Sequence, residues 1–264
     1  AGLQTRLDPV ALSHLEPGHC LVGHRATGSG ADAVIVPCDR PHTFEVLATT
    51  TATSDTPYQK FARTDVCASA TYEAVDRRID NVVRGLIAVG VRQGDRVGVL
   101  METRPSALVA IAALSRLGAV SVLMPPDGDL HEAARLGGVK EILTDPTNLA
   151  AARQLALQVL VLGGGESRDL NLAGDDDVID MERIDPDAVT LPGWYRPNPG
   201  FARDLAFVAF STVGGELVAK QITNYRWALS AFGTASAAAL SSSDTVYCLT
   251  PLHHQSGLLV AVGG

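Results

Sequence analysis

The strongest constraint on the fold is a regular alternation of helical and strand-like apolar segments between residues 71 and 162. The helical segments place apolar residues three or four positions apart, and the strand segments are short runs of Val, Ile and Leu. The predicted order is helix 75–87, strand 96–101, helix 107–117, strand 119–124, helix 131–136, strand 141–144, helix 149–157 and strand 159–162. Strands that alternate with helices through short loops form parallel sheets with right-handed crossovers. The predicted class is α/β, with a largely parallel sheet and helices on both faces.

Turn-forming residues mark the ends of the first two helices. Thr71 is the predicted N-cap of the first helix, and Gly90 is its predicted C′ residue. Pro105 suits the first turn of the second helix, and Gly118 ends that helix. Gly163-Gly164-Gly165 follows a strand but lacks the Gly-x-Gly-x-x-Gly spacing and a following helix, which argues against a dinucleotide-binding oxidoreductase.

The stretch from Leu205 to Gly257 carries the candidate chemistry. A buried strand is predicted at 205–210, and a second strand at 218–222 would make the intervening glycines a hairpin turn. Hydroxyls, glycines and a lysine after a buried strand also suit an anion, because backbone N–H groups and a cation can converge there. The candidate phosphate-binding residues are Ser211, Thr212, Gly214, Gly215 and Lys220. From the residues alone, a phosphate site and a surface hairpin both remain open.

A helix at 224–240 capped by Thr223, a strand at 245–249 and a helix from Leu258 are predicted beyond this stretch. Between the last two lies Pro251-Leu252-His253-His254-Gln255-Ser256-Gly257. Adjacent histidines on an extended loop are expected to point to opposite sides, so a metal site at this pair is not expected.

The flanking regions are less regular. Residues 1–56 form a predicted irregular segment and linker, with short strands at 33–36 and 44–47, and residues 57–264 form the predicted main domain. Residues 166–203 are polar and proline-rich, which predicts a connector without a long helix. The acidic run that begins at Asp175 is interpreted as a solvated loop, with a divalent-ion site as the alternative.

Composition excludes several classes of function. A net charge of −8 argues against a nucleic-acid partner, and no apolar run approaches the length of a membrane span. The four cysteines lack zinc-site spacing and are interpreted as reduced, buried thiols. The chain begins Ala1-Gly2 without a visible signal peptide, so a cytoplasmic location is expected, and the missing initiator methionine suggests a piece of a longer polypeptide.

The order of these motifs resembles the adenylate-forming enzymes: acyl-CoA synthetases, fatty acyl-AMP ligases and related adenylation domains. The resemblance covers residues 58–264 and rests on Thr71-Tyr72-Glu73, Gly90-Val91-x-x-Gly94-Asp95-Arg96-Val97, Leu117-Gly118-Ala119-Val120 before Pro125, Phe210-Ser211-Thr212 through Lys220, and Pro251-Leu252-His253-His254-x-x-Gly257. It implies the N-terminal part of the large domain of such an enzyme. By the same resemblance, His253, His254 and Gly257 are candidate binding residues for a carboxylic-acid substrate, and His254 matches the family position beside the acyl group.

The phosphate loop departs from the family pattern Thr-Ser-Gly-Thr-Thr-Gly-x-Pro-Lys-Gly. Val213 stands at the first glycine position, Glu216 replaces a later glycine, and no proline precedes Lys220. Fewer hydroxyls and an added carboxylate are expected to weaken a triphosphate cradle.

The resemblance implies ATP, Mg²⁺ and coenzyme A as cofactors, and a fatty or other lipophilic carboxylic acid as substrate. The family residues for adenine, Mg²⁺, ribose and the catalytic lysine match no part of these 264 residues, so the chain alone is expected to be inactive and no catalytic residue is predicted. The alternative is a non-catalytic binding module with a degenerate phosphate loop.

Overall fold

The computed structural model describes residues 20–22, 34–36, 44–45, 65–163, 170, 172, 177–240 and 250–262. The chain divides into two compact units, one of residues 1–78 with 163–171 and the other of residues 79–162 with 172–264. The predicted boundary at residue 56 stays a prediction. No helix in the described ranges is long and apolar enough to cross a membrane.

The smaller unit contains a three-stranded antiparallel sheet. Its strands are β1 (Cys20–Val22), β2 (Val34–Val36) and β3 (Phe44–Glu45), in the order β2-β1-β3. Strands β2 and β3 lie where the sequence predicted them, whereas β1 was not predicted.

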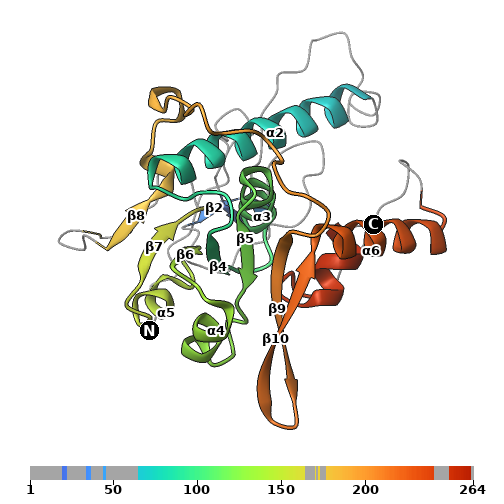
Figure 1. Cartoon of the computed structure of the whole chain (residues 1–264). Coiled ribbons are helices and arrows are strands. Elements are labelled where there is room, and N and C mark those ends of the chain that lie inside the picture. Colours follow the sequence, from blue (N-terminus) through green and yellow to red (C-terminus); the bar gives the residue numbers. More distant parts are fainter. Residues whose placement is uncertain are drawn as a thin grey trace, which may run out of the picture. The chain divides into compact units, whose positions relative to one another are not determined.

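The larger unit is built on a seven-stranded sheet in the order β10-β9-β5-β4-β6-β7-β8 (Figure 1). All neighbouring strands are parallel except β9 and β10, which form an antiparallel hairpin. The α/β class is therefore confirmed. The strands are β4 (Arg96–Leu100), β5 (Val120–Leu123), β6 (Glu141–Thr144), β7 (Gln158–Val161), β8 (Val178–Asp180), β9 (Leu205–Val213) and β10 (Glu216–Thr223).

The helices lie in the connections that the sequence predicted. They are α2 (Asp65–Ala88), α3 (Pro105–Leu117), α4 (Leu130–Gly137), α5 (Leu149–Arg153) and α6 (Asn224–Ala237), with a final π-helical segment, η4, at Gly257–Val262. Pro105 occupies the first turn of α3, Gly118 ends α3 in the left-handed region, and the Thr223 hydroxyl accepts from the Arg226 N–H to cap α6.

Several sequence predictions need correction. Thr71 lies inside α2 and is not its N-cap, because the helix begins six residues earlier, at Asp65. Helix α5 ends at Arg153, before Ala156 adopts a φ of +52° that a helix cannot continue. The connector 166–203 contains the unpredicted strand β8, which pairs with β7. The predicted strand 245–249 and the environments of the four cysteines lie outside the described residues.

Both faces of the central sheet are covered. The last residues of β4, β5, β6 and β7 are buried without alternation, which is typical of a parallel sheet between two layers of helices. On one face, Val97 and Val99 join a core that includes Leu86 of α2 and Leu114 of α3. On the other, the backbone of Gly137 in α4 approaches Val122, where a larger residue would not fit.

The connections diverge at the central strand β4. Helix α3 leads from β4 to β5 on one side of it, and α4 leads from β5 to β6 on the other. Open α/β sheets bind ligands at the carboxyl edge of such a switch point. The candidate site is therefore expected where β4, β5 and β9 end.

We predict that Gly118→Ala lowers the free energy of unfolding by about 2–3 kcal/mol, because it combines backbone strain with a steric clash. Gly118 has a φ of +78°, and an added Cβ would lie 2.6 Å from Pro199 Cγ. Gly94→Ala is the matched control, since Gly94 has a φ of +83° but open space around it. Urea unfolding measures both variants, and equal losses would contradict the steric part of the prediction.

Candidate functional site

The glycine-rich stretch forms the turn of the β9–β10 hairpin. Val213 pairs with Glu216, and Gly214 and Gly215 have φ values of +61° and +88°. Two positive φ values in a two-residue connection match a type I′ turn, which favours glycine. The hairpin extends away from the parallel strands (Figure 1). The predicted second strand is thus confirmed, and whether phosphate binds here stays a prediction.

The strand register places Ser211 and Lys220 on the same face of the hairpin. Lys220 pairs with Ala209 and Ser211 with Val218, and alternation adds Val213 and Glu216 to that same face. Thr212 belongs to the opposite face. Nearer the base of the hairpin, this face carries Phe207, whose ring lies 5.1 Å from that of Trp227 in α6. Helix α6 therefore covers the base of the face, while Lys220 and Glu216 remain exposed.

An open cleft of about 960 Å³ lies beside this face. Among the predicted site residues, Ser211, Lys220 and His254 line it, and the rest of its wall comes from Phe210, α6 and residues 255, 256 and 259. Thr212, Gly214, Gly215, His253 and Gly257 are not part of the lining. The structure therefore brings Ser211 and Lys220 of the hairpin together with His254, which lies more than thirty residues beyond Lys220 in sequence.

Ser211 is the polar residue of the cleft with the clearest need for a partner. Its hydroxyl oxygen is buried, and within the described residues it makes no hydrogen bond. Buried polar atoms are nearly always hydrogen-bonded, so an oxygen without a partner beside a cleft fits a site that a ligand completes. A phosphate oxygen would accept from the Lys220 ammonium, and from this hydroxyl after its side chain rotates toward the cleft.

The two histidines lie in a turn rather than on an extended loop. The His254 N–H donates to the Pro251 carbonyl at 3.0 Å, and the two imidazole rings lie 4.6 Å apart, tilted by 39°. The expectation that they point to opposite sides is therefore wrong, because the turn brings the rings together. Gly257 is required by packing, since a Cβ would meet the carbonyl oxygens of Thr250 and Pro251.

His253 lies near the switch point of the sheet. Its side chain is partly buried, and burial is the main cause that lowers its pKa, with a further contribution from His254. The charges of Asp127 and Glu102 oppose that shift. Glu102 follows β4 and Asp127 follows β5, so both carboxylates come from the strand ends where the connections diverge. Sequence reasoning missed them, although their position just after predicted strands was the available signal.

The described residues contain no cluster of three or more His, Cys, Asp or Glu side chains that suits a metal ion. A Mg²⁺ ion therefore has no ligand set that can be named within these ranges. For ATP, Lys220 and Ser211 provide the groups that a phosphate needs. Glu216 opposes an anion from the same face, but at four strand residues from Lys220 it lies roughly 13 Å away, beyond one Debye length at physiological salt.

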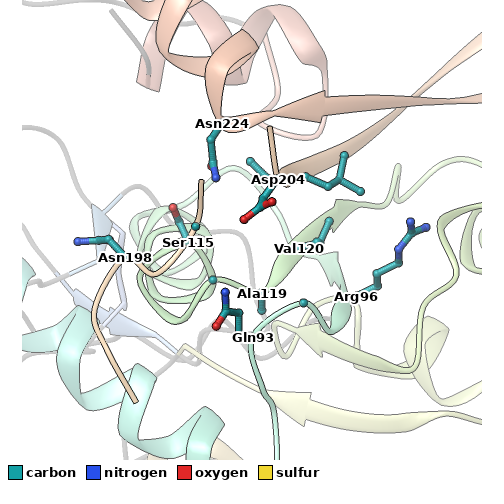
Figure 2. A pocket seen from close by; sticks show the side chains of 13 residues that line it. Gln93, Arg96, Ser115, Ala119, Val120, Asn198, Asp204 and Asn224 are labelled. Atoms are coloured by element: carbon teal, nitrogen blue, oxygen red, sulfur yellow. The ribbon is translucent and has the colours of Figure 1, made fainter. Parts of the chain in front are cut away.

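A second pocket of about 380 Å³ opens at the opposite, amino edge of the sheet (Figure 2). Its polar groups already serve local structure. Asp204 accepts from the Phe201 N–H at 2.8 Å, and the Asn224 amide donates to the Phe201 carbonyl at 3.0 Å. Figure 2 shows the Arg96 side chain directed away from both, and it donates to the Gly137 carbonyl. The carboxyl-edge cleft is therefore the stronger candidate.

Comparison with known proteins gives one family and a common fold. A family described as AMP-binding enzyme matches residues 49–264. The Mycobacterium tuberculosis medium/long-chain-fatty-acid–CoA ligase FadD6 is 30% identical over 200 residues, which cover 73% of this chain and 31% of the relative. Triostin synthetase I of Streptomyces triostinicus is 34% identical over 127 residues, which cover 44% of this chain and 24% of the relative. The chain thus spans about a third or less of the length of these relatives.

Solved structures agree on the fold. Apo MatB from Rhodopseudomonas palustris has a TM-score of 0.56 at 21% identity. The match covers 72% of this chain and 36% of MatB. The o-succinylbenzoate coenzyme A synthetase MenE from Bacillus subtilis, in complex with AMP, has a TM-score of 0.58 at 19% identity. The match covers 73% of this chain and 46% of MenE.

We predict that His253 makes stability depend on pH below about 6.5, the ordinary pKa of histidine. Because the folded state disfavours the charged imidazole, the unfolded chain binds the proton first, and the free energy of unfolding falls as pH decreases from 6.5 to 5. In His253→Gln this decline should be smaller. Urea midpoints across that range measure it, and parallel curves for the two proteins would refute the prediction.

Proposed function

Because the chain belongs to the AMP-binding enzyme family, we propose that its protein activates a fatty or other lipophilic carboxylic acid as an acyl adenylate and transfers it to coenzyme A. The observation that supports this most is the carboxyl-edge cleft, where Lys220 and Ser211 of the hairpin lie with His254. FadD6, whose match covers 73% of this chain, is a medium/long-chain-fatty-acid–CoA ligase by name.

The residues of the cleft divide into polar and apolar groups that suit the two substrates. The ammonium of Lys220 would attract phosphate oxygens, and the Ser211 hydroxyl would donate to one of them. ATP, when bound, supplies the adenylyl group and the pyrophosphate leaving group. Preorganised charge and hydrogen-bond donors are the main catalytic resources for such transfers. Gly233, Ala237 and Leu259 offer a small and apolar wall for the hydrocarbon part of an acid.

The proposed activity belongs to the protein that carries this sequence, with the chain alone inactive. ATP, Mg²⁺ and coenzyme A are its proposed cofactors, a small carboxylic acid is its substrate, and the remainder of a longer polypeptide supplies the groups not found here. We place that protein in the cytoplasm.

The regular hairpin favours a second candidate, a non-catalytic binding module. Val213 pairs with Glu216 beside the two-glycine turn, so the antiparallel pairing continues to the tip of the hairpin. A tip of this kind leaves fewer backbone N–H groups for phosphate than a glycine-rich loop does. ATP–pyrophosphate exchange separates the candidates, since only the ligase catalyses it.

We predict that Lys220→Ala in the complete protein raises the apparent ATP constant by roughly 10- to 100-fold, because a charge-assisted hydrogen bond is lost. Val213→Gly with Glu216→Gly should lower that constant only slightly, since the carboxylate that the pair removes lies roughly 13 Å from Lys220 and is screened by salt. Gln221→Ala is the matched control on the same strand, with its side chain on the opposite face. If every variant exchanges pyrophosphate like the unchanged protein, the phosphate assignment fails.

We also predict that His254→Ala changes the apparent constant of the acid, or the preferred acyl length, while the ATP constant stays within about twofold. A lost neutral hydrogen bond corresponds to a change of about three- to tenfold. His131→Ala, at an exposed position on α4, is the control. The measurement is exchange over a series of acids of increasing length. An unchanged acid profile in a folded variant would show that His254 only packs.

A further inference from the structure

The carboxyl edge of the sheet is held by one buried carboxylate. Asp145, directly after β6, is fully buried and accepts from the Glu102 N–H at 2.8 Å and the Asn148 N–H at 2.9 Å. The Asn148 amide adds a third donor at 3.0 Å, and Arg104 Nε lies 3.8 Å away. The loop after β4 is thus fixed to the loop after β6, the neighbouring strand.

Thr103 connects this loop to a part of the chain that is distant in sequence. Its hydroxyl oxygen accepts from the backbone N–H of Leu252 at 3.1 Å, across 149 residues of sequence. Leu252 is buried, so its N–H has little access to water if this acceptor is removed. The bond therefore connects the loop after β4 to the start of the turn that contains both histidines, residues 251–258, called the histidine turn below.

Two backbone hydrogen bonds connect the residues of the histidine turn to one another. The His254 N–H donates to Pro251 and the Leu258 N–H donates to His254, both at 3.0 Å. A shift at Leu252 would consequently displace His253 beside Glu102 and Asp127, and His254 in the cleft. Thr103 itself does not line the cleft.

We propose that Thr103 is a positioning residue, which sets the place of the histidine turn at the acid-binding end of the cleft through its bond to Leu252. The part that concerns the acid rests on the proposed function. The part that concerns the turn rests on the hydrogen bonds alone.

The first test uses Thr103→Val, which keeps the shape and loses the acceptor, and Thr103→Ser, which keeps the acceptor. In the complete protein, the valine variant should raise the acid's KM by roughly three- to tenfold with the KM of ATP unchanged, and the serine variant should restore it. Thr147→Val is the matched control, since Thr147 accepts from Arg104 in the same network and has no hydrogen bond to the turn among the described residues. Equal acid KM values in the unchanged protein and Thr103→Val would overturn the acid part.

The second test needs no enzymatic activity. An NMR titration of the chain should show the His253 pKa rising toward its ordinary value in Thr103→Val, because a loosened turn exposes the ring, and not in Thr147→Val. Slow hydrogen exchange at the Leu252 amide of the unchanged chain is also expected, and it requires no variant. An unshifted titration or an unprotected amide would overturn the positioning role.

The two tests separate the two claims. If the complete protein lacks pyrophosphate exchange while the titration shifts as expected, the proposed function fails and the role of Thr103 in the turn stands. If exchange is present but neither KM nor the titration responds, the function stands and the positioning role fails.

Discussion

The buried carboxylate of Asp145 is the interaction on which the candidate site depends. Strand pairing fixes β4 beside β6, but it ends at Leu100 and Thr144, and the loops beyond need another constraint. Asp145 supplies it by accepting from Glu102 and Asn148, while the Thr144 hydroxyl donates to the Leu100 carbonyl at 2.8 Å. Breaking such a network leaves buried N–H groups unpaired, which costs about 1–3 kcal/mol for each. The Asp145 side chain therefore helps to fix the loops after β4 and β6 at the switch point.

The hairpin shows how a change in a loop alters the way an anion can be held. In a glycine-rich phosphate loop, backbone N–H groups surround the anion, whereas pairing here continues to Val213 and Glu216. In the proposed function, recognition of phosphate then falls to side chains on the face that carries Ser211 and Lys220. Binding an anion through side chains costs rotamer entropy, because flexible side chains must adopt fixed rotamers, whereas a backbone cradle is already ordered. We therefore expect weaker phosphate binding than a complete loop would give, without loss of the fold.

The sequence predicted the central sheet because its strands are buried on both faces and its helix ends carry Pro105, Gly118 and Thr223. It missed β8, since three residues beside an acidic run give no periodic signal, and it extended α5 too far because Ala156 is an unexpected residue at positive φ. The carboxylates near His253 were missed for another reason. Their position just after predicted strands was a signal, but their proximity to His253 follows from strand order, which no local pattern encodes. Three residues that line the cleft, Ser211, Lys220 and His254, were named from the sequence, but the wall from α6 was not.

The residues that line the cleft indicate what kind of ligand would fit it. None of the side chains of α6 is buried, yet the residues of this helix and its C-cap that face the cleft are small: Ser230, Gly233, Thr234, Ala237 and the capping residue Ala238. A row of small residues leaves volume that larger side chains would fill, and Gly233 has open space where a Cβ would lie. The cation and the imidazole, in contrast, come from the hairpin and from the histidine turn. A ligand with one anionic end and one extended apolar end matches this division, since each end meets groups of its own kind. The same helix carries Tyr225, Leu229 and Phe232, all exposed at a helical spacing, so the apolar character of α6 extends well beyond the wall of the cleft.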